Sequence, residues 1–201
     1  MKRALIVVDV QNDFIDGPMK VEGAKEIIPT INKMMENFDI VVITKDWHPY
    51  DHCSFQENGG KWPAHCVATT YGSKLHEDLK VKHGAYYVNK ANNSDIEQYS
   101  AFYDAAGNDT GLSSLLKKPL KVDTVYICGL TTDYCVLETA LDAYNCEFDT
   151  HVVLNACKEV DSDKCKEAHE KMYRLGIKTQ HVSFLPNTDI MNFEKVKPNI
   201  D

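Results

Sequence analysis

The apolar positions along this chain fall into short β-branched runs separated by longer stretches with helical spacing. Apolar runs predict six strands, at Ala4–Asp9, Ile40–Thr44, Ala85–Val88, Thr124–Leu130, Thr150–Leu154 and Lys178–Ser183. Positions spaced three or four apart predict helices at Ala24–Asn37, Gly111–Lys118, Asp133–Tyr144 and Ser162–Leu175. Strands that alternate with helices are typical of parallel βαβ crossovers. We therefore expect one domain over residues 1–201, a three-layer α/β/α fold around a mostly parallel six-stranded sheet.

Three stretches lie outside this pattern. Residues 47–72 and 91–110 show no periodicity, and the first of them is rich in His, Trp, Pro and Gly. Loops of that length inside a compact domain are usually functional or disordered. The tail after Pro186 is polar, and we expect it to lie on the surface.

Composition narrows the class of protein. Of 201 residues, 43% are hydrophobic and 26% charged, which is ordinary for a globular chain. The net charge of −8, with no basic stripe, argues against a nucleic-acid or membrane partner, and no apolar run reaches the length of a membrane span. Seven cysteines without a disulfide-framework spacing favour a reducing, cytoplasmic setting.

Residues able to do chemistry follow four of the predicted strands. Asp9 ends the first strand, Asp46 and His48 follow the second, Lys90 follows the third, and Cys135 follows the fourth. In open parallel sheets, ligands bind outside the carboxyl ends of the strands. The sequence therefore places these side chains at one edge of the sheet.

Cys135 follows a strand and a glycine turn, in what is predicted to be the first turn of a helix. Free backbone N–H groups at a helix N-terminus favour a thiolate, although a buried packing cysteine is the alternative. As a nucleophile, Cys135 needs a base, and Asp9 is the candidate, with Lys90 as its charge partner. Backbone N–H groups of Thr131 and Cys135 are candidate donors to an oxyanion. This set suits acyl transfer at a carbonyl.

The first long loop carries a second pattern. Asp46 and His48 lie two residues apart, and His52 and His65 follow. A carboxylate with imidazoles suits a zinc- or iron-type divalent ion, and a solvated polar loop is the alternative. Glu57 is a further possible oxygen ligand.

Motifs along nearly the whole chain resemble one family. They are ALIVVDVQNDF, ITKDWHPYDHCSF, KWPAHCV, the isolated Lys90, YSAF followed by TGL, and GLTTDYCVLETALDAY. Together they resemble the isochorismatase-like cysteine hydrolases and, within them, the nicotinamidases, which also act on pyrazinamide. The resemblance implies hydrolysis of nicotinamide to nicotinate and ammonia through a cysteine thioester, in NAD salvage.

The resemblance also implies roles for individual residues. It places a catalytic triad at Asp9, Lys90 and Cys135, and metal ligands at Asp46, His48 and His65, with His52 a fourth ligand in some members. The ion is expected to be zinc, with iron or manganese as alternatives. The substrate is expected to contact Phe14, Trp62, Tyr99 and Tyr134, with its ring nitrogen towards the metal. A cis peptide maps to Leu130–Thr131, and family members often form homo-oligomers.

Two other functions compete with this interpretation. One is a different amidase of the superfamily, acting on a carbamoyl or maleamate-type substrate, but such relatives generally lack the Asp-x-His…His set. The other is a non-catalytic metal- or redox-sensing protein whose thiol is oxidised. Such a protein has no need for Asp9, Lys90 and an oxyanion turn together.

Overall fold

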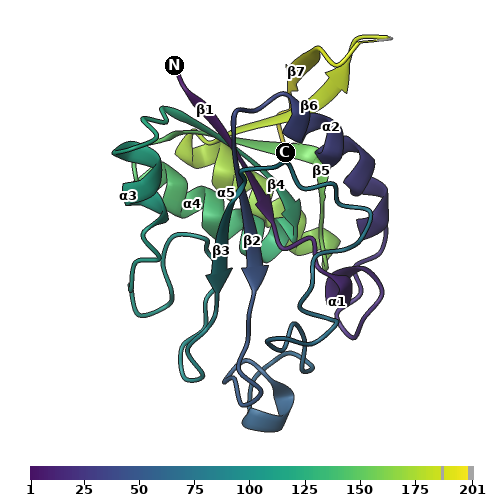
Figure 1. Cartoon of the computed structure of the whole chain (residues 1–201), viewed down its shortest axis with the longest axis vertical. Coiled ribbons are helices and arrows are strands. Elements are labelled where there is room, and N and C mark those ends of the chain that lie inside the picture. Colours follow the sequence, from purple (N-terminus) through teal and green to yellow (C-terminus); the bar gives the residue numbers. More distant parts are fainter. Residues whose placement is uncertain (187, 199–201) are drawn as a thin grey trace.

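A seven-stranded sheet forms the centre of the structure, a computed structural model that describes residues 1–186 and 188–198. The strand order is β3-β2-β1-β4-β5-β6-β7 (Figure 1). The strands are β1 (Arg3–Val8), β2 (Ile40–Asp46), β3 (Tyr86–Lys90), β4 (Thr124–Leu130), β5 (Asp149–Lys158), β6 (Lys178–Phe184) and β7 (Met191–Lys195). All neighbouring pairs are parallel except β6 with β7. The predicted mostly parallel α/β/α fold is confirmed, with one strand more than expected.

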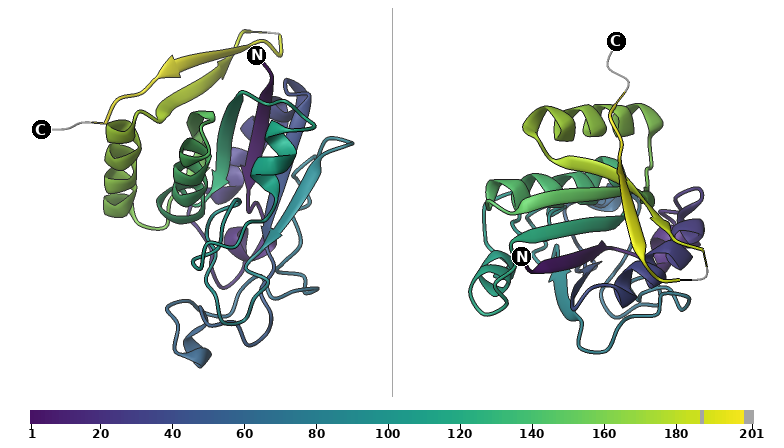
Figure 2. Two further views of the ribbon diagram at one scale, coloured as in Figure 1. Left: turned by 90° about the vertical axis from the view of Figure 1, so that its left-hand side faces the viewer. Right: turned by 90° about the horizontal axis from the view of Figure 1, so that it is seen from above.

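Helices cover both faces of this sheet. They are α1 (Asn12–Ile15), α2 (Ile28–Glu36), α3 (Leu112–Lys117), α4 (Leu137–Asn145) and α5 (Ser162–Leu175). Short turns of 3-10 helix occur at Ala24–Ile27 and Gln56–Asn58, and a π-helical turn at Thr132–Val136 precedes α4. Figure 2 shows α4 and α5 on one face and α2 on the other. The three layers therefore match the prediction, although α1 and the π-helical turn were not expected.

The seventh strand was missed in the prediction for the tail. The described residues after Pro186, 188–198, are exposed or half-buried, as expected of polar surface chain, and residues 187 and 199–201 lie outside the described ranges. Within this tail, β7 pairs antiparallel with β6, with Val182 opposite Phe193. The Phe193 ring packs 4.9 Å from the Tyr126 ring, measured between centroids. Alternating half-buried side chains give this short segment a face that packs on the sheet.

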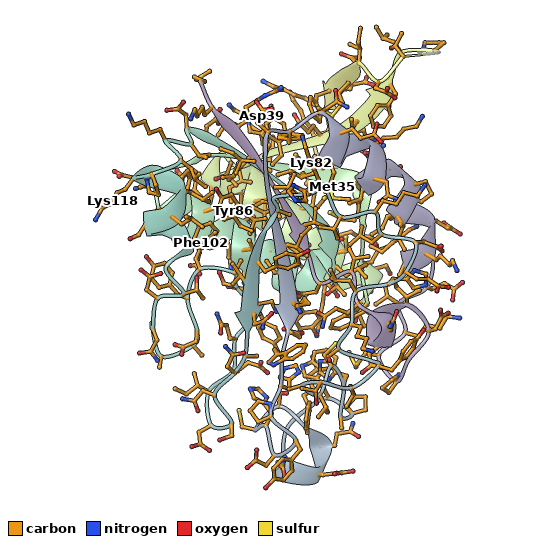
Figure 3. All side chains as sticks on the ribbon, in the orientation of Figure 1. Met35, Asp39, Lys82, Tyr86, Phe102 and Lys118 are labelled. Carbon is orange, nitrogen blue, oxygen red and sulfur yellow. The ribbon has the colours of Figure 1, made fainter. Side chains whose placement is uncertain are left out.

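The core is filled from both faces of the sheet. Every residue of β4 and all of β1 except Arg3 are buried. Met35 of α2 and Phe102 of the β3–α3 connection are also fully enclosed, whereas Lys118 points outward (Figure 3). Strands buried on both faces read as continuous apolar runs, which explains why these two were readily predicted.

The chain reverses direction across the sheet between β1 and β4. From β1 it continues to β2 and β3 on one side, and from β4 it continues to β5 and β6 on the other. The long connections after β2 and β3 extend beyond the carboxyl ends of these strands (Figure 1). A switch point of this kind leaves a crevice where ligands bind in open α/β sheets.

No helix in the described ranges 1–186 and 188–198 is long and apolar enough to cross a membrane.

Gly129 in β4 lies opposite Val8 in β1, at the switch point. Its φ is +112°, and a Cβ built there would lie 2.1 Å from the Val8 carbonyl oxygen. We expect Gly129→Ala to lower the free energy of unfolding by about 4 kcal/mol or more, because backbone must move to relieve the contact. The measurement is urea unfolding.

Gly107→Ala is the matched control. Gly107 also has a positive φ (+83°) but nothing lies within 4 Å of its added Cβ. It should cost only about 1 kcal/mol, from the unfavourable φ alone. Equal losses of unfolding free energy in the two variants would show that the close approach of β1 and β4 does not require glycine at position 129.

Candidate active site

The carboxyl ends of four strands bring together the residues predicted for chemistry. Asp46 and Lys90 are directly paired in the register of β2 and β3. Asp9 follows β1, and Cys135 lies in the π-helical turn after β4. All four are at least nine-tenths buried. The predicted clustering at one sheet edge is therefore what the structure shows.

Lys90 lies at the centre of this cluster. Its Nζ is 2.8 Å from Asp9 Oδ2, and it donates hydrogen bonds to Asp46 Oδ1 and, at 3.3 Å, to Cys135 Sγ. Burial alone would lower the pKa of Lys90, but the charges of Asp46 and Asp9 hold that pKa well above its usual value. Lys90 is therefore a permanent buried cation facing two carboxylates and a thiol.

Asp9 is enclosed and has a raised pKa. Its Oδ1 accepts a hydrogen bond of 2.6 Å from the Thr44 hydroxyl. Burial raises the pKa of Asp9 to about 6, against the lowering effect of Lys90. Its Oδ2 is near the Lys90 ammonium but accepts no well-aligned hydrogen bond from the described residues. That oxygen has free capacity to take a proton.

Cys135 differs from the prediction in two ways. It lies in a π-helical turn, Thr132–Val136, and not in the first turn of α4. A thiolate was expected to be favoured there, but burial raises the pKa of Cys135 well above its usual value, and Lys90 offsets this only in part. The Asp9 carboxylate is close to this thiol, because one of its oxygens lies within 4.8 Å of Cys135 Sγ. The resting group is thus a thiol with an acceptor beside it.

Asp46, His48 and His65 form a group able to hold a metal ion, with one ligand atom from each lying within 4.8 Å of the others. The Nδ1 atoms of His48 and His65 lie 3.0 and 2.8 Å from the carbonyl oxygens of His65 and Pro63. A carbonyl can only accept, so each Nδ1 donates and each Nε2 keeps a lone pair for a metal. Burial lowers the pKa of His48 to about 4, which keeps this ring neutral. The donor set fits a divalent ion such as zinc.

His52 and Glu57 lie outside the Asp46–His48–His65 group, but His52 forms a second set able to hold a metal ion, with His48 and Glu97. His52 Nε2 lies 3.2 Å from the Ile96 carbonyl, and its Nδ1 lies 2.8 Å from the Ser54 hydroxyl. Both ring nitrogens therefore have protein partners. Glu57 is exposed on the 3-10 turn Gln56–Asn58.

An aromatic pocket opens next to Cys135. The four predicted substrate contacts line it together with Met19, Asp46, His65, Thr131, Cys135 and Val160. Trp62 Nε1 donates a 3.0 Å hydrogen bond to the Tyr99 hydroxyl, and the Trp62 and Tyr134 rings meet edge to face at 5.0 Å. Flat rings held in this way suit a planar aromatic ligand. The peptide bond between Leu130 and Thr131 is cis, as the resemblance implied.

Two supporting residues were not predicted. The side chain of Gln11 accepts from Asp46 N and donates to Asp46 O, both at 2.8 Å, and so holds the end of β2. The hydroxyl of Thr44 binds Asp9 as described above. Thr44 left a signal, a polar residue inside an apolar strand, and Gln11 lies within the first quoted motif.

Comparison with known proteins identifies the family. Residues 3–182 match the isochorismatase domain. A nicotinamidase of Acinetobacter baylyi is 40% identical over 193 residues, which cover 87% of this chain and 90% of that protein. The chain belongs to the isochorismatase family, as its motifs indicated.

Solved structures agree. A pyrazinamidase of Pyrococcus horikoshii in complex with zinc has a TM-score of 0.83 and 38% identity, covering 90% of this chain and 99% of that one. PnC1 of L. infantum, in complex with nicotinate, has a TM-score of 0.87 and 32% identity, covering 90% and 92%. Two of these relatives are thus named as a nicotinamidase and a pyrazinamidase, and the third is bound to nicotinate.

Replacing Lys90 should destabilise the protein strongly. Lys90→Met leaves the Asp9 and Asp46 carboxylates buried without their cation, so we expect a loss of about 3–5 kcal/mol in the free energy of unfolding. Lys178→Met is the control, since the Lys178–Asp149 pair is about 40% exposed on both sides. It should lose about 1 kcal/mol or less. Similar urea midpoints for both variants would contradict the central role of Lys90.

Proposed function

We propose that this chain is a nicotinamidase, an amidohydrolase that converts nicotinamide to nicotinate and ammonia in NAD salvage and also accepts pyrazinamide. The observation that carries the proposal is a buried Asp9–Lys90–Cys135 cluster beside an aromatic pocket. The names of the relatives at 32–40% identity support the substrate.

In the first half of the reaction, Asp9 takes the proton of the Cys135 thiol. The sulfur then forms a bond to the amide carbon, and the carbonyl electron pair moves to its oxygen. Lys90 stabilises the sulfur anion, to which it already donates a hydrogen bond. Backbone N–H groups of Thr131 and Cys135, both in the pocket wall, receive the oxyanion. Asp9 returns the proton to the amide nitrogen, and the C–N bond breaks. Ammonia departs, and the acyl group remains on Cys135 as a thioester.

In the second half, water enters the position that ammonia has left. Asp9 takes one proton from this water, whose oxygen attacks the thioester carbon. The C–S bond breaks, the proton on Asp9 returns to Cys135 Sγ, and the product leaves as nicotinic acid, which loses its remaining proton to solvent to give nicotinate. Asp9 carries one proton in each half of the reaction, which suits a pKa near the working pH.

Asp46, His48 and His65 are the residues that would hold a divalent cation, with zinc as the proposed ion. When bound, it supplies a Lewis acid that orients the substrate ring through its nitrogen. Phe14, Trp62, Tyr99 and Tyr134 exclude water from the faces of that ring. Lys90 pairs with Asp46 Oδ1, whereas His65 Nε2 lies 4.0 Å from the other oxygen, Asp46 Oδ2.

The alternative of a redox sensor has less support. A sensor cysteine is accessible and has a depressed pKa. Cys135 is 6% exposed, and burial raises its pKa well above the usual value. The alternative of a carbamoyl or maleamate amidase leaves the Asp46–His48–His65 group without a purpose.

Ammonia release from nicotinamide tests the proposal. Cys135→Ala should lower kcat by about 10⁴-fold or more, because no thioester can form. Cys146→Ala, which alters a half-buried cysteine bonded to Tyr103 and outside the pocket, should leave the rate unchanged. Turnover that survives in Cys135→Ala would reject the mechanism.

The same assay tests the metal. Removal of divalent ions by a chelator should abolish ammonia release, and zinc should restore it with about one ion bound per chain by elemental analysis. His48→Ala should lose the bound ion, whereas His83→Ala, in an exposed loop, should retain it. Full activity of metal-free protein would remove the metal from the proposal.

The pH dependence should report Asp9. Since the base must be deprotonated and its pKa is about 6, kcat/KM should fall about tenfold per pH unit below that value. Thr44→Val removes a hydrogen bond that stabilises the carboxylate, so the acid limb should move to higher pH by about one unit. A limb that stays in place in Thr44→Val would show that another group is titrating.

A further inference from the structure

The carboxylate of Asp133 joins the nucleophile turn, which is the π-helical turn Thr132–Val136 that carries Cys135, to a distant segment of the chain. Asp133 lies two residues before Cys135 and is 7% exposed. Its Oδ1 accepts a hydrogen bond of 3.1 Å from Val160 N, and its Oδ2 accepts one of 3.0 Å from Asp161 N. Both oxygens are therefore committed to the connection between β5 and α5. None of the steps described above uses Asp133.

The segment that Asp133 holds forms part of the pocket. Val160 lines the cavity together with Thr131, Tyr134 and Cys135. Yet Val160 is 46% exposed, so burial does not fix its position. The two backbone hydrogen bonds to a buried carboxylate are the interactions that do, since hydrogen bonds to a charged acceptor are the stronger kind.

A second contact ties the same segment to the neighbouring residue of the turn. The Asp161 side chain caps α5 by accepting from Asp163 N and Lys164 N. One turn further on, Lys164 Nζ donates a 2.8 Å hydrogen bond to the Tyr134 hydroxyl, but this contact is exposed. Exposed contacts of long charged side chains contribute little. Of the two ties, the one to the buried Asp133 carboxylate, whose two hydrogen bonds are part-buried, is the one expected to hold the wall.

We propose that Asp133 is a positioning residue that determines how well the aromatic amide substrate fits. It does so by holding Val160 in the wall of the aromatic pocket beside Cys135. The inference rests on the proposed function for its substrate. The chemistry requires a carboxylate at this position, because the two facing groups are both N–H donors. An amide side chain would accept from one of them and present its own NH₂ to the other.

The test separates KM from kcat, with nicotinamide as substrate. Asp133→Asn should raise KM about 10- to 100-fold, as a shifted pocket wall does, while kcat stays within about threefold. Val160→Ala should raise KM in the same direction. The double variant should show no larger increase than the greater of the two, since both act on one wall. Lys164→Gln, which breaks only the exposed tie, should change KM by less than about twofold.

Three results would overturn the proposal. A fall in kcat with KM unchanged would place the effect of Asp133 on the nucleophile turn. A lower melting temperature with unchanged kinetics would make its role one of stability alone. Additive KM effects in the double variant would show that Asp133 and Val160 act separately.

Amide hydrogen exchange on the wild-type protein tests the Asp133 hydrogen bonds directly, without substrate and without a variant that has to fold. The amides of Val160 and Asp161 should exchange at least about tenfold more slowly than that of Ser162, the first residue of α5. Equal rates would reject the tie itself. If exchange is slow but nicotinamide releases no ammonia, the proposed function fails and the tie remains.

Discussion

The site depends on compensating charge where water does not reach. Asp9 and Asp46 are buried side by side, and each would be costly to ionise there without a cation. Lys90 supplies that cation because β3 pairs with β2 in a register that sets it directly opposite Asp46. The same ammonium reaches Asp9 Oδ2 and Cys135 Sγ. One strand register therefore makes three other functional groups possible.

The two carboxylates that share Lys90 have different acidities. Burial acts to raise the pKa of both, yet that of Asp46 is lowered, because His48 and His65 add to the effect of Lys90. Asp9 lacks those neighbours, feels the charge of Asp46, and has its pKa raised to about 6. Two carboxyl groups in one cluster are thereby separated into a permanent anion suited to a metal and a group suited to moving protons.

Sequence patterns predicted the parts that local chemistry determines. Apolar runs located the central strands, and their last residues located Asp9, Asp46 and Lys90. The missed features depend on tertiary contacts. β7 forms only because Met191–Lys195 pairs with β6, and Gln11 is recognised only once Asp46 lies beside it. The prediction that Cys135 favours a thiolate was wrong, because it considered the helix dipole and not the burial of the thiol, which raises its pKa.

The order of the strands has a consequence for how activity is acquired during folding. Asp9 and Cys135 lie far apart in the sequence and meet only when β1 pairs with β4, a contact that closes a long loop. Helices such as α5 form from local contacts and need no such closure. In refolding experiments, helical circular dichroism should therefore return before catalysis, so that enzymatic turnover reports completion of the sheet. Turnover that returns together with the helical signal would show that the pairing of β1 with β4 is not a late event.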